Sequence, residues 1–344
     1  MWSGECPGPG GVFHGAGCGR AEVVDSTGER GWWWPVALEG DGAHGPQALQ
    51  LLGHSLVLWR NPEGEPVLLD DRCPHRGARL SLGRVINERL QCPYHGWQFD
   101  AKGTCALVPA VPGFNPPASS AVARHGVKVA HGLLWCNLAN EADHGPPDLS
   151  HLPARRLVYG PFEVATSAPR AVENFLDTSH FAFVHEGWLG DAAHPEVPDH
   201  EVSHTPDGRP VIEHYRAWQP RATASAAQGE WVDYRYEVLN PYAALLTKRS
   251  EAGGPQDSYV IWACPVTPES CRLWFAQYTT DTETPAEALR DFQVAIFAQD
   301  QPVLESQQPK TLPLSGGEAM SAADRLSAGY RRYLKAQRVT FGTC

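Results

Sequence analysis

The fold of the N-terminal half follows from two segments, CPHRG at residues 73–77 and CPYHGW at residues 92–97. Each segment offers one thiol and one imidazole within a few residues. Proline and glycine beside both pairs favour tight loops over helix, so that backbone N–H groups can point at a bound group. The pattern predicts a metal centre with sulfur ligands on one side and imidazole ligands on the other.

A Rieske [2Fe–2S] cluster requires this ligand set, because two thiolates hold one iron and two imidazoles hold the other. A structural zinc site is the alternative, since two cysteines and two histidines also bind zinc. Zinc ligand pairs are usually separated by about two to four residues, whereas only Pro74 lies between the first cysteine and histidine. We therefore predict a Rieske cluster held by Cys73, His75, Cys92 and His95.

A second group of candidate site residues is Asn174, Asp177, His180 and His185. A mononuclear Fe(II) that binds O₂ needs two imidazoles and one carboxylate on one face, and the histidines can supply the imidazoles. Residues 172–185 have a helical pattern, but five residues of ideal helix turn a side chain by about 140°. A bulge or a helix end is therefore required between the histidines. Asp177 precedes His180 by three residues and can orient its ring.

With these motifs the chain resembles the Rieske non-haem iron oxygenases. Arg76-Gly77 and Gly96-Trp97, directly after the histidines, strengthen the resemblance, and neither loop has the extra cysteine found in respiratory Rieske subunits. In its length and its C-terminal residues the chain resembles the monooxygenase branch of this family. That branch includes vanillate and dicamba O-demethylases, pheophorbide a oxygenase-like enzymes and saxitoxin-pathway hydroxylases, and the resemblance is greatest to the last. The resemblance covers roughly residues 31–344.

The resemblance implies roles for the second group. His180 and His185 would be iron ligands, and Asp177 would bridge His180 to His95 of a neighbouring subunit. The pattern that carries these roles begins at Asn174, which we include among the catalytic residues. The family places its carboxylate ligand late in the chain at the end of a helix, which favours Asp300.

Two other acidic residues, Asp291 and Glu305, are rivals for the third ligand. Four remaining histidines lie in a polar, proline-containing region, and we expect surface or hydrogen-bonding roles for them: His194, His200, His204 and His214.

The expected fold class is α+β. Short apolar runs bounded by turn residues predict an all-β Rieske domain over 31–144, followed by a linker over 145–155. Residues 156–344 are expected to form a helix-grip-like catalytic domain with an antiparallel sheet and a helix running from about 286 towards Asp300. A glycine-rich extension over 1–30 is expected to be disordered. A chain of 344 residues allows two domains with separate cores.

Composition limits the partners. A formal net charge of -11 argues against nucleic acid and anionic membranes, and no apolar run is long enough to span a bilayer. The odd number of scattered cysteines, 9, favours a reducing compartment, so we expect a cytoplasmic protein.

These features predict an enzyme that uses O₂ to hydroxylate or oxidatively demethylate a small organic molecule. No dinucleotide-binding fingerprint is visible, so electrons from NAD(P)H would arrive through a separate ferredoxin or flavin reductase. An arene cis-dihydroxylase and a non-catalytic Rieske electron carrier are the alternatives. The resemblance implies a homotrimer, in which each cluster lies near a neighbour's iron. The substrate does not follow from the sequence.

Overall fold

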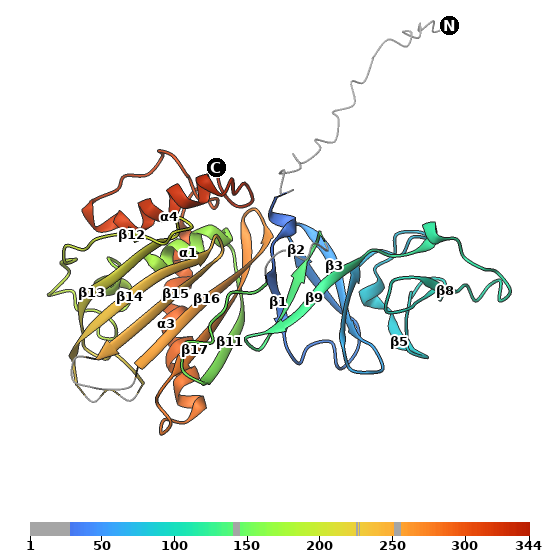
Figure 1. Ribbon diagram of the computed structural model, residues 1–344, viewed down its shortest axis with the longest axis horizontal. Coiled ribbons are helices and arrows are strands. Elements are labelled where there is room, and N and C mark those ends of the chain that lie inside the picture. The colour runs from blue at the N-terminus through green and yellow to red at the C-terminus, as the bar shows by residue number, and fades with distance from the viewer. Residues whose placement is uncertain (1–27, 140–144, 225, 227, 251–255) are drawn as a thin grey trace, which may run out of the picture.

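A computed structural model of the protein describes residues 28–139, 145–224, 226, 228–250 and 256–344. Two β-rich domains lie side by side in an elongated molecule (Figure 1). The expected α+β class, with an all-β N-terminal domain and an antiparallel sheet beyond it, is confirmed. None of the helices in this part of the chain is long and apolar enough to cross a membrane.

The N-terminal domain has two antiparallel sheets. A 6-stranded sheet has the order β1-β10-β9-β4-β3-β2, and a 4-stranded sheet has the order β5-β6-β7-β8. The strands are β1 (Trp34–Leu38), β2 (Gln47–Leu51), β3 (His54–Arg60), β4 (Pro66–Asp70), β5 (Arg84–Ile86), β6 (Arg89–Gln91), β7 (Gln98–Phe99), β8 (Cys105–Leu107), β9 (Arg124–Ala130) and β10 (Leu133–Asn137).

The C-terminal domain is a 7-stranded antiparallel sheet with helices packed on it, in the order β11-β17-β16-β15-β14-β13-β12. The strands are β11 (Arg155–Val164), β12 (Ser203–His204), β13 (Pro210–Gln219), β14 (Glu230–Asn240), β15 (Ala243–Ser250), β16 (Gln256–Thr267) and β17 (Ser270–Thr279). The helices are α1 (Ala168–Leu176), α2 (Phe181–Val184), α3 (Ala286–Ser306) and α4 (Arg325–Ala336).

Strand β3 shows how one apolar run serves two cores. Leu56 and Leu58 point to one face of the larger sheet and belong to a core that continues into the C-terminal domain. Val57 and Trp59 point to the other face and pack in the cluster of side chains that contains Cys73. One face of the N-terminal sheet therefore shares its core with the C-terminal sheet, while the other face has a core of its own.

Glu29 holds the start of the described chain against its end. Its carboxylate is buried and accepts hydrogen bonds from the Tyr242 hydroxyl and from the N–H groups of Thr340 and Phe341, each at 3.0 Å. Residues 28–30 are thus part of the folded body, unlike the extension expected over 1–30, of which residues 1–27 lie outside the described part. The expected linker is also shorter, since β11 begins at Arg155.

Replacing Glu29 by alanine should weaken the contact between the first described residues and the C-terminal segment. The substitution removes the acceptor of two backbone N–H groups, while the Tyr242 hydroxyl keeps the Phe341 carbonyl at 2.9 Å; this loss costs roughly 2–4 kcal/mol of unfolding free energy. Urea unfolding followed by tryptophan fluorescence measures this loss. Glu63→Ala, at an exposed turn residue, is the matched control and should change stability by less than about 0.5 kcal/mol. Equal stability of the two variants would contradict this role.

Candidate iron centres

The two cysteine loops of the N-terminal domain have the same backbone conformation. The N–H of each cysteine, Cys73 and Cys92, donates to the carbonyl five residues later at 2.8 Å. Gly77 and Gly96 have φ of 70° and 72° and donate back to the carbonyls of the two cysteines. Residues with a Cβ rarely adopt this conformation, so the glycine in each segment is required by the turn.

The four predicted cluster ligands come together with thiols inside and imidazoles outside. Cys73 and Cys92 are buried, whereas His75 and His95 are exposed with ring centroids 4.5 Å apart. Burial raises the pKa of the Cys73 thiol to about 11, so a Cys73 thiolate requires a bound cation. This arrangement fits a Rieske cluster, with one iron on the buried sulfurs and the other on the exposed imidazoles.

The second centre depends on an interruption of helix after α1. At Asp177 the backbone is extended, and its Oδ1 accepts from both the N–H and the hydroxyl of Ser179 at 2.7 Å. Such a local turn competes with helix, and the short α2 starts only at Phe181. Gly190 then folds back over α2, where a Cβ would lie 2.3 Å from the Phe181 backbone. The helical pattern of residues 172–185 is thus divided into α1 and α2, and the expected helix end is present at His185, the residue directly after α2.

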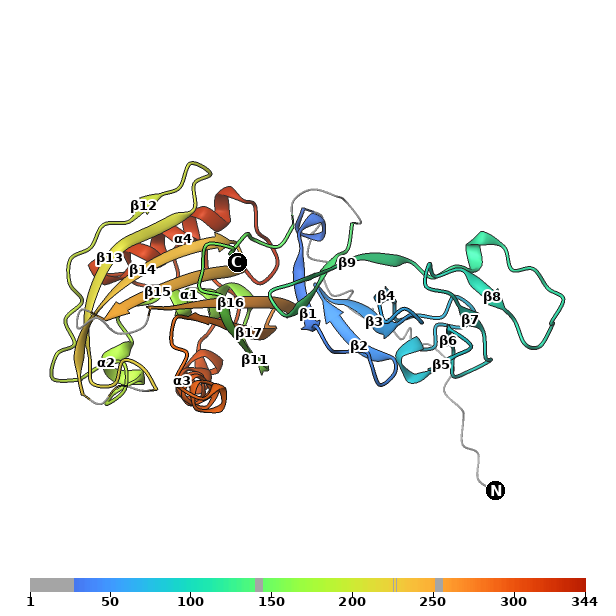
Figure 2. The same ribbon diagram turned by 60° about the horizontal axis from the view of Figure 1, so that its bottom comes forward.

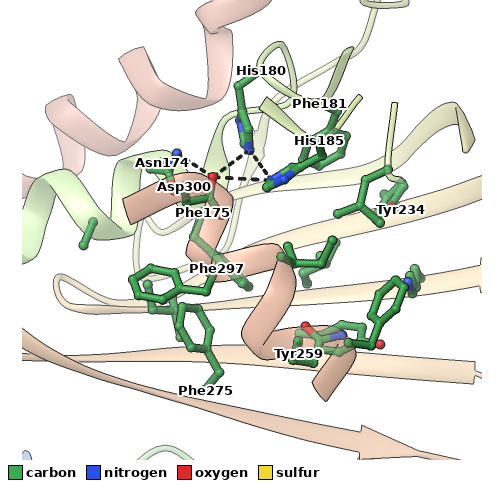
Figure 3. A pocket seen from close by; sticks show the side chains of 18 residues that line it. Asn174, Phe175, His180, Phe181, His185, Tyr234, Tyr259, Phe275, Phe297 and Asp300 are labelled. Atoms are coloured by element: carbon green, nitrogen blue, oxygen red, sulfur yellow. Dashed lines mark hydrogen bonds and ion pairs between the residues drawn. The ribbon is translucent and has the colours of Figure 1, made fainter. Parts of the chain in front are cut away.

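His180 and His185 lie at the two ends of α2 and meet Asp300 of α3 (Figure 3). Their Nε2 atoms are 3.2 Å apart, and Oδ1 of Asp300 is 3.5 Å from His180 and 3.3 Å from His185. Ligands about 2.1 Å from one metal ion, at 90–110° to each other, would be about 3.0–3.4 Å apart. The triad can therefore hold one metal ion. Asn174 Nδ2 lies 3.4 Å from the same Asp300 oxygen.

Both histidines are oriented by side chains that lie next to their Nδ1 atoms. Nδ1 of His185 is 2.8 Å from the Gln299 amide oxygen, which fixes the ring so that Nε2 faces the triad. Nδ1 of His180 faces the Asp177 carboxylate at 3.5 Å. Burial by itself would raise the pKa of Asp177, but the interactions with His180 and Ser179 outweigh it, and the pKa is lowered. Asp177 thus stays a carboxylate behind a ligand imidazole.

A pocket opens beside the triad between the sheet and helices α1 and α3. Its walls are mainly aromatic and aliphatic, and they include Phe175, Phe181, Phe275, Ile296 and Phe297. Such walls suit a flat, largely apolar molecule. The polar groups that face it, apart from the triad, include the side chains of Lys248, Tyr259 and Gln293.

The rival carboxylates do not reach the triad. Asp291 is exposed on α3, and Glu305 accepts a hydrogen bond from the N–H of Ala165 at 3.1 Å. Asp300 itself differs from the expectation in one respect: it does not end the helix, because α3 continues through Pro302 to Ser306.

The remaining histidines lie elsewhere. His194, His204 and His214 are exposed, while His200 is buried and its Nδ1 is 3.0 Å from the Pro198 carbonyl. Sequence patterns did not indicate Gln299 or Lys248; Gln299 could have been found from its place directly before Asp300.

Comparison with protein families gives two matches. Residues 32–123 match the Rieske [2Fe-2S] domain. Residues 164–339 match the vanillate O-demethylase oxygenase C-terminal domain. The first range contains both cysteine loops, and the second contains the triad.

Known proteins are similar over most of the chain. Methylxanthine N1-demethylase NdmA of Pseudomonas putida is 33% identical, covering 89% of this chain and 88% of that protein. Methylxanthine N3-demethylase NdmB of the same organism is 32% identical, covering 91% and 90%. The structure of NdmA with caffeine gives a TM-score of 0.77 at 30% identity, covering 90% and 91%. Dicamba monooxygenase bound to dicamba gives 0.74 at 25% identity, covering 90% and 98%.

Replacing Asp300 by alanine should remove the mononuclear metal and leave the Rieske cluster. The carboxylate is the only negative ligand of the predicted triad, whereas the cluster loops lie in the other domain. Iron analysis together with the visible spectrum of the cluster measures both centres in one sample. Asp291→Ala, an exposed carboxylate on the same helix, should retain both. Full iron content in the Asp300 variant would exclude this residue as a ligand.

Proposed function

This chain belongs to the Rieske non-haem iron oxygenases, and from that premise we propose that it hydroxylates a C–H bond of a small planar molecule. Where the carbon is a methyl group on nitrogen or oxygen, the same step ends in demethylation. The observation that carries the proposal is the triad of His180, His185 and Asp300 beside an aromatic pocket. When bound, the two iron centres supply single-electron transfer and O₂ activation.

The protein's own residues orient the substrate and the ligands. The aromatic walls bind a flat ring and exclude water from the space beside the triad. Gln299 and Asp177 hold the two imidazoles with Nε2 facing that space. Among the open possibilities, N-demethylation is favoured because two relatives at more than 30% identity demethylate methylxanthines at nitrogen.

The stoichiometry of N-demethylation shows which co-substrates and electron donors the enzyme requires. An N-methyl group, O₂, two electrons and two protons give the N–H product, formaldehyde and water. The electrons require a separate ferredoxin or flavin reductase that takes them from NAD(P)H. A cytoplasmic location stays a prediction, supported by the five described cysteines outside the cluster loops, which form no disulfide and four of which are buried. The finer likeness to saxitoxin-pathway hydroxylases also stays a prediction.

The shape of the chain supports electron delivery between subunits. The loops around β5 to β8 and the segment around α2 lie at opposite ends of the molecule (Figure 2). At one end His75 and His95 are exposed, and at the other the Asp177 side chain is 30% exposed beside His180. We propose head-to-tail association, closed as a homotrimer, in which Asp177 bridges His180 to His95 of a neighbouring subunit.

The reaction class is tested with ¹⁸O₂, a reductase and a panel of N-methyl and O-methyl aromatic compounds that includes caffeine and dicamba. We expect formaldehyde in equal amount to the demethylated product, and one ¹⁸O atom in any stable alcohol product. Incorporation of both atoms of one O₂ would favour the cis-dihydroxylase. Electron transfer without any oxygenated product from iron-replete protein would favour the electron carrier.

The bridging role is tested with Asp177→Asn, which keeps the shape of the side chain and removes its charge. Both metal centres should remain, while turnover falls at least about tenfold, in the range known for groups that orient metal ligands. Rapid mixing of the reduced protein with O₂ should show slow reoxidation of the cluster. Asp191→Asn, in the exposed loop after α2, is the control and should behave as wild type. Normal reoxidation in the Asp177 variant would exclude the bridge.

A further inference from the structure

Lys248 is a buried lysine in the wall of the pocket beside the triad. It lies on β15 with its side chain only 5% exposed, directly opposite Tyr234 on β14 and Asp257 on β16. Directly opposed residues on antiparallel strands share one face of the sheet. Tyr234 and Lys248 both line the pocket. A lysine is rarely placed on such a face without a specific partner.

The contacts of the Lys248 ammonium leave part of its donor capacity unused. One N–H donates to the backbone carbonyl of Ala222, and Nζ lies 5.2 Å from the centre of the Tyr259 ring. An ammonium group has three donors. Within the described residues, no carboxylate forms an ion pair with Lys248.

The acidic neighbour is occupied elsewhere. Oδ2 of Asp257 accepts from the Tyr259 hydroxyl at 3.3 Å, and Oδ1 accepts from the Gln277 amide at 3.3 Å. Burial lowers the pKa of Lys248, while the negative charges of Asp257 and Glu230 act in the opposite direction. A buried ammonium without an ion-pair partner is unfavourable, so an acceptor supplied by a ligand would be bound strongly.

The position of Lys248 determines how a ligand would lie. Figure 3 shows Tyr259 on the side of the pocket away from the His180–His185–Asp300 triad, and the Lys248 ammonium lies beside the Tyr259 ring. A molecule bound between aromatic walls would therefore meet metal ligands at one end and a cation at the other.

We propose that Lys248 is a specificity-determining residue that binds an acceptor oxygen, carbonyl or carboxylate, on the ring of a planar substrate. The anchored oxygen lies at the Lys248 end, and the carbon to be oxidised faces the triad. The inference rests on the proposed function, which it deepens by naming the substrate class: aromatic or heteroaromatic rings that carry an oxygen acceptor across the ring from the oxidised carbon.

The test measures binding and needs no turnover. Three compounds share one ring system: 1-methylindole has no acceptor oxygen, 5-acetyl-1-methylindole has a carbonyl, and 1-methylindole-5-carboxylate has an anionic group, both across the ring from the N-methyl carbon. Their dissociation constants are measured by calorimetry on the anaerobic holoenzyme. The variants are Lys248→Met, which keeps the length of the side chain, and Arg249→Met, which removes an exposed cation from the next position of the same strand.

Wild type should bind at least one oxygen-bearing compound about tenfold or more tighter than 1-methylindole, the ratio expected for a hydrogen bond to a charged group. The preferred compound shows whether the natural acceptor is a carbonyl or a carboxylate. Lys248→Met should lose the preference and still bind 1-methylindole normally, whereas Arg249→Met should keep it.

Other results would overturn the proposal. In wild type these are equal affinities for the three compounds, or no binding of either oxygen-bearing compound. In Lys248→Met they are a preference that survives, or an equal loss of affinity for all three compounds, which would indicate a purely structural lysine. The wild-type comparison needs no variant, so it stands even if Lys248→Met fails to fold. Because no turnover is involved, failure of oxygen insertion would count against the proposed function and not against this anchor.

Discussion

The convergence of His180 and His185 on Asp300 depends on the shortness of the helix between them. Five residues of continuous helix would turn the second imidazole about 140° away from the first. Helix α2 contains only Phe181–Val184, so the histidines lie at its two ends, and His185 has left the helical conformation with φ of -112° and ψ of 32°. The Asp177 carboxylate ends α1 before this short helix, because it accepts two hydrogen bonds from Ser179. The same carboxylate faces His180 from behind. One side chain therefore sets both the backbone path and the orientation of a ligand, which links the local fold to the chemistry of the site.

The sequence predicted the features that local chemistry determines. The cysteine loops follow from their ligands, prolines and glycines, and the need for a helix end between His180 and His185 follows from helix geometry. Strands such as β3 were visible as apolar runs, but which of their faces pack against the other domain was not. Alternate residues of β3 enter two different cores, and only the packing of the two sheets decides this. The role of the buried Glu29 carboxylate was not predicted for the same reason, since its hydrogen-bond partners are more than two hundred residues away in the sequence.

The residues that the sequence did not reveal are those whose role depends on a neighbour in space. Gln299 has a role that other helical glutamines lack only because Nδ1 of His185 lies beside its amide oxygen. Lys248 would be read as an exposed residue, yet it is buried because β14 and β16 flank its strand and helices cover that face of the sheet. Ligand motifs thus identify the reaction class, whereas the pocket side chains that select a substrate require the tertiary structure.

Two separate iron centres in one chain are what the proposed reaction requires, and EPR spectroscopy of the anaerobically reduced protein with added nitric oxide tests for both most directly. We predict the signal of a reduced Rieske cluster together with that of an Fe(II)–nitrosyl complex at the triad. A Rieske signal without the nitrosyl signal, in protein shown to be iron-replete, would contradict the account.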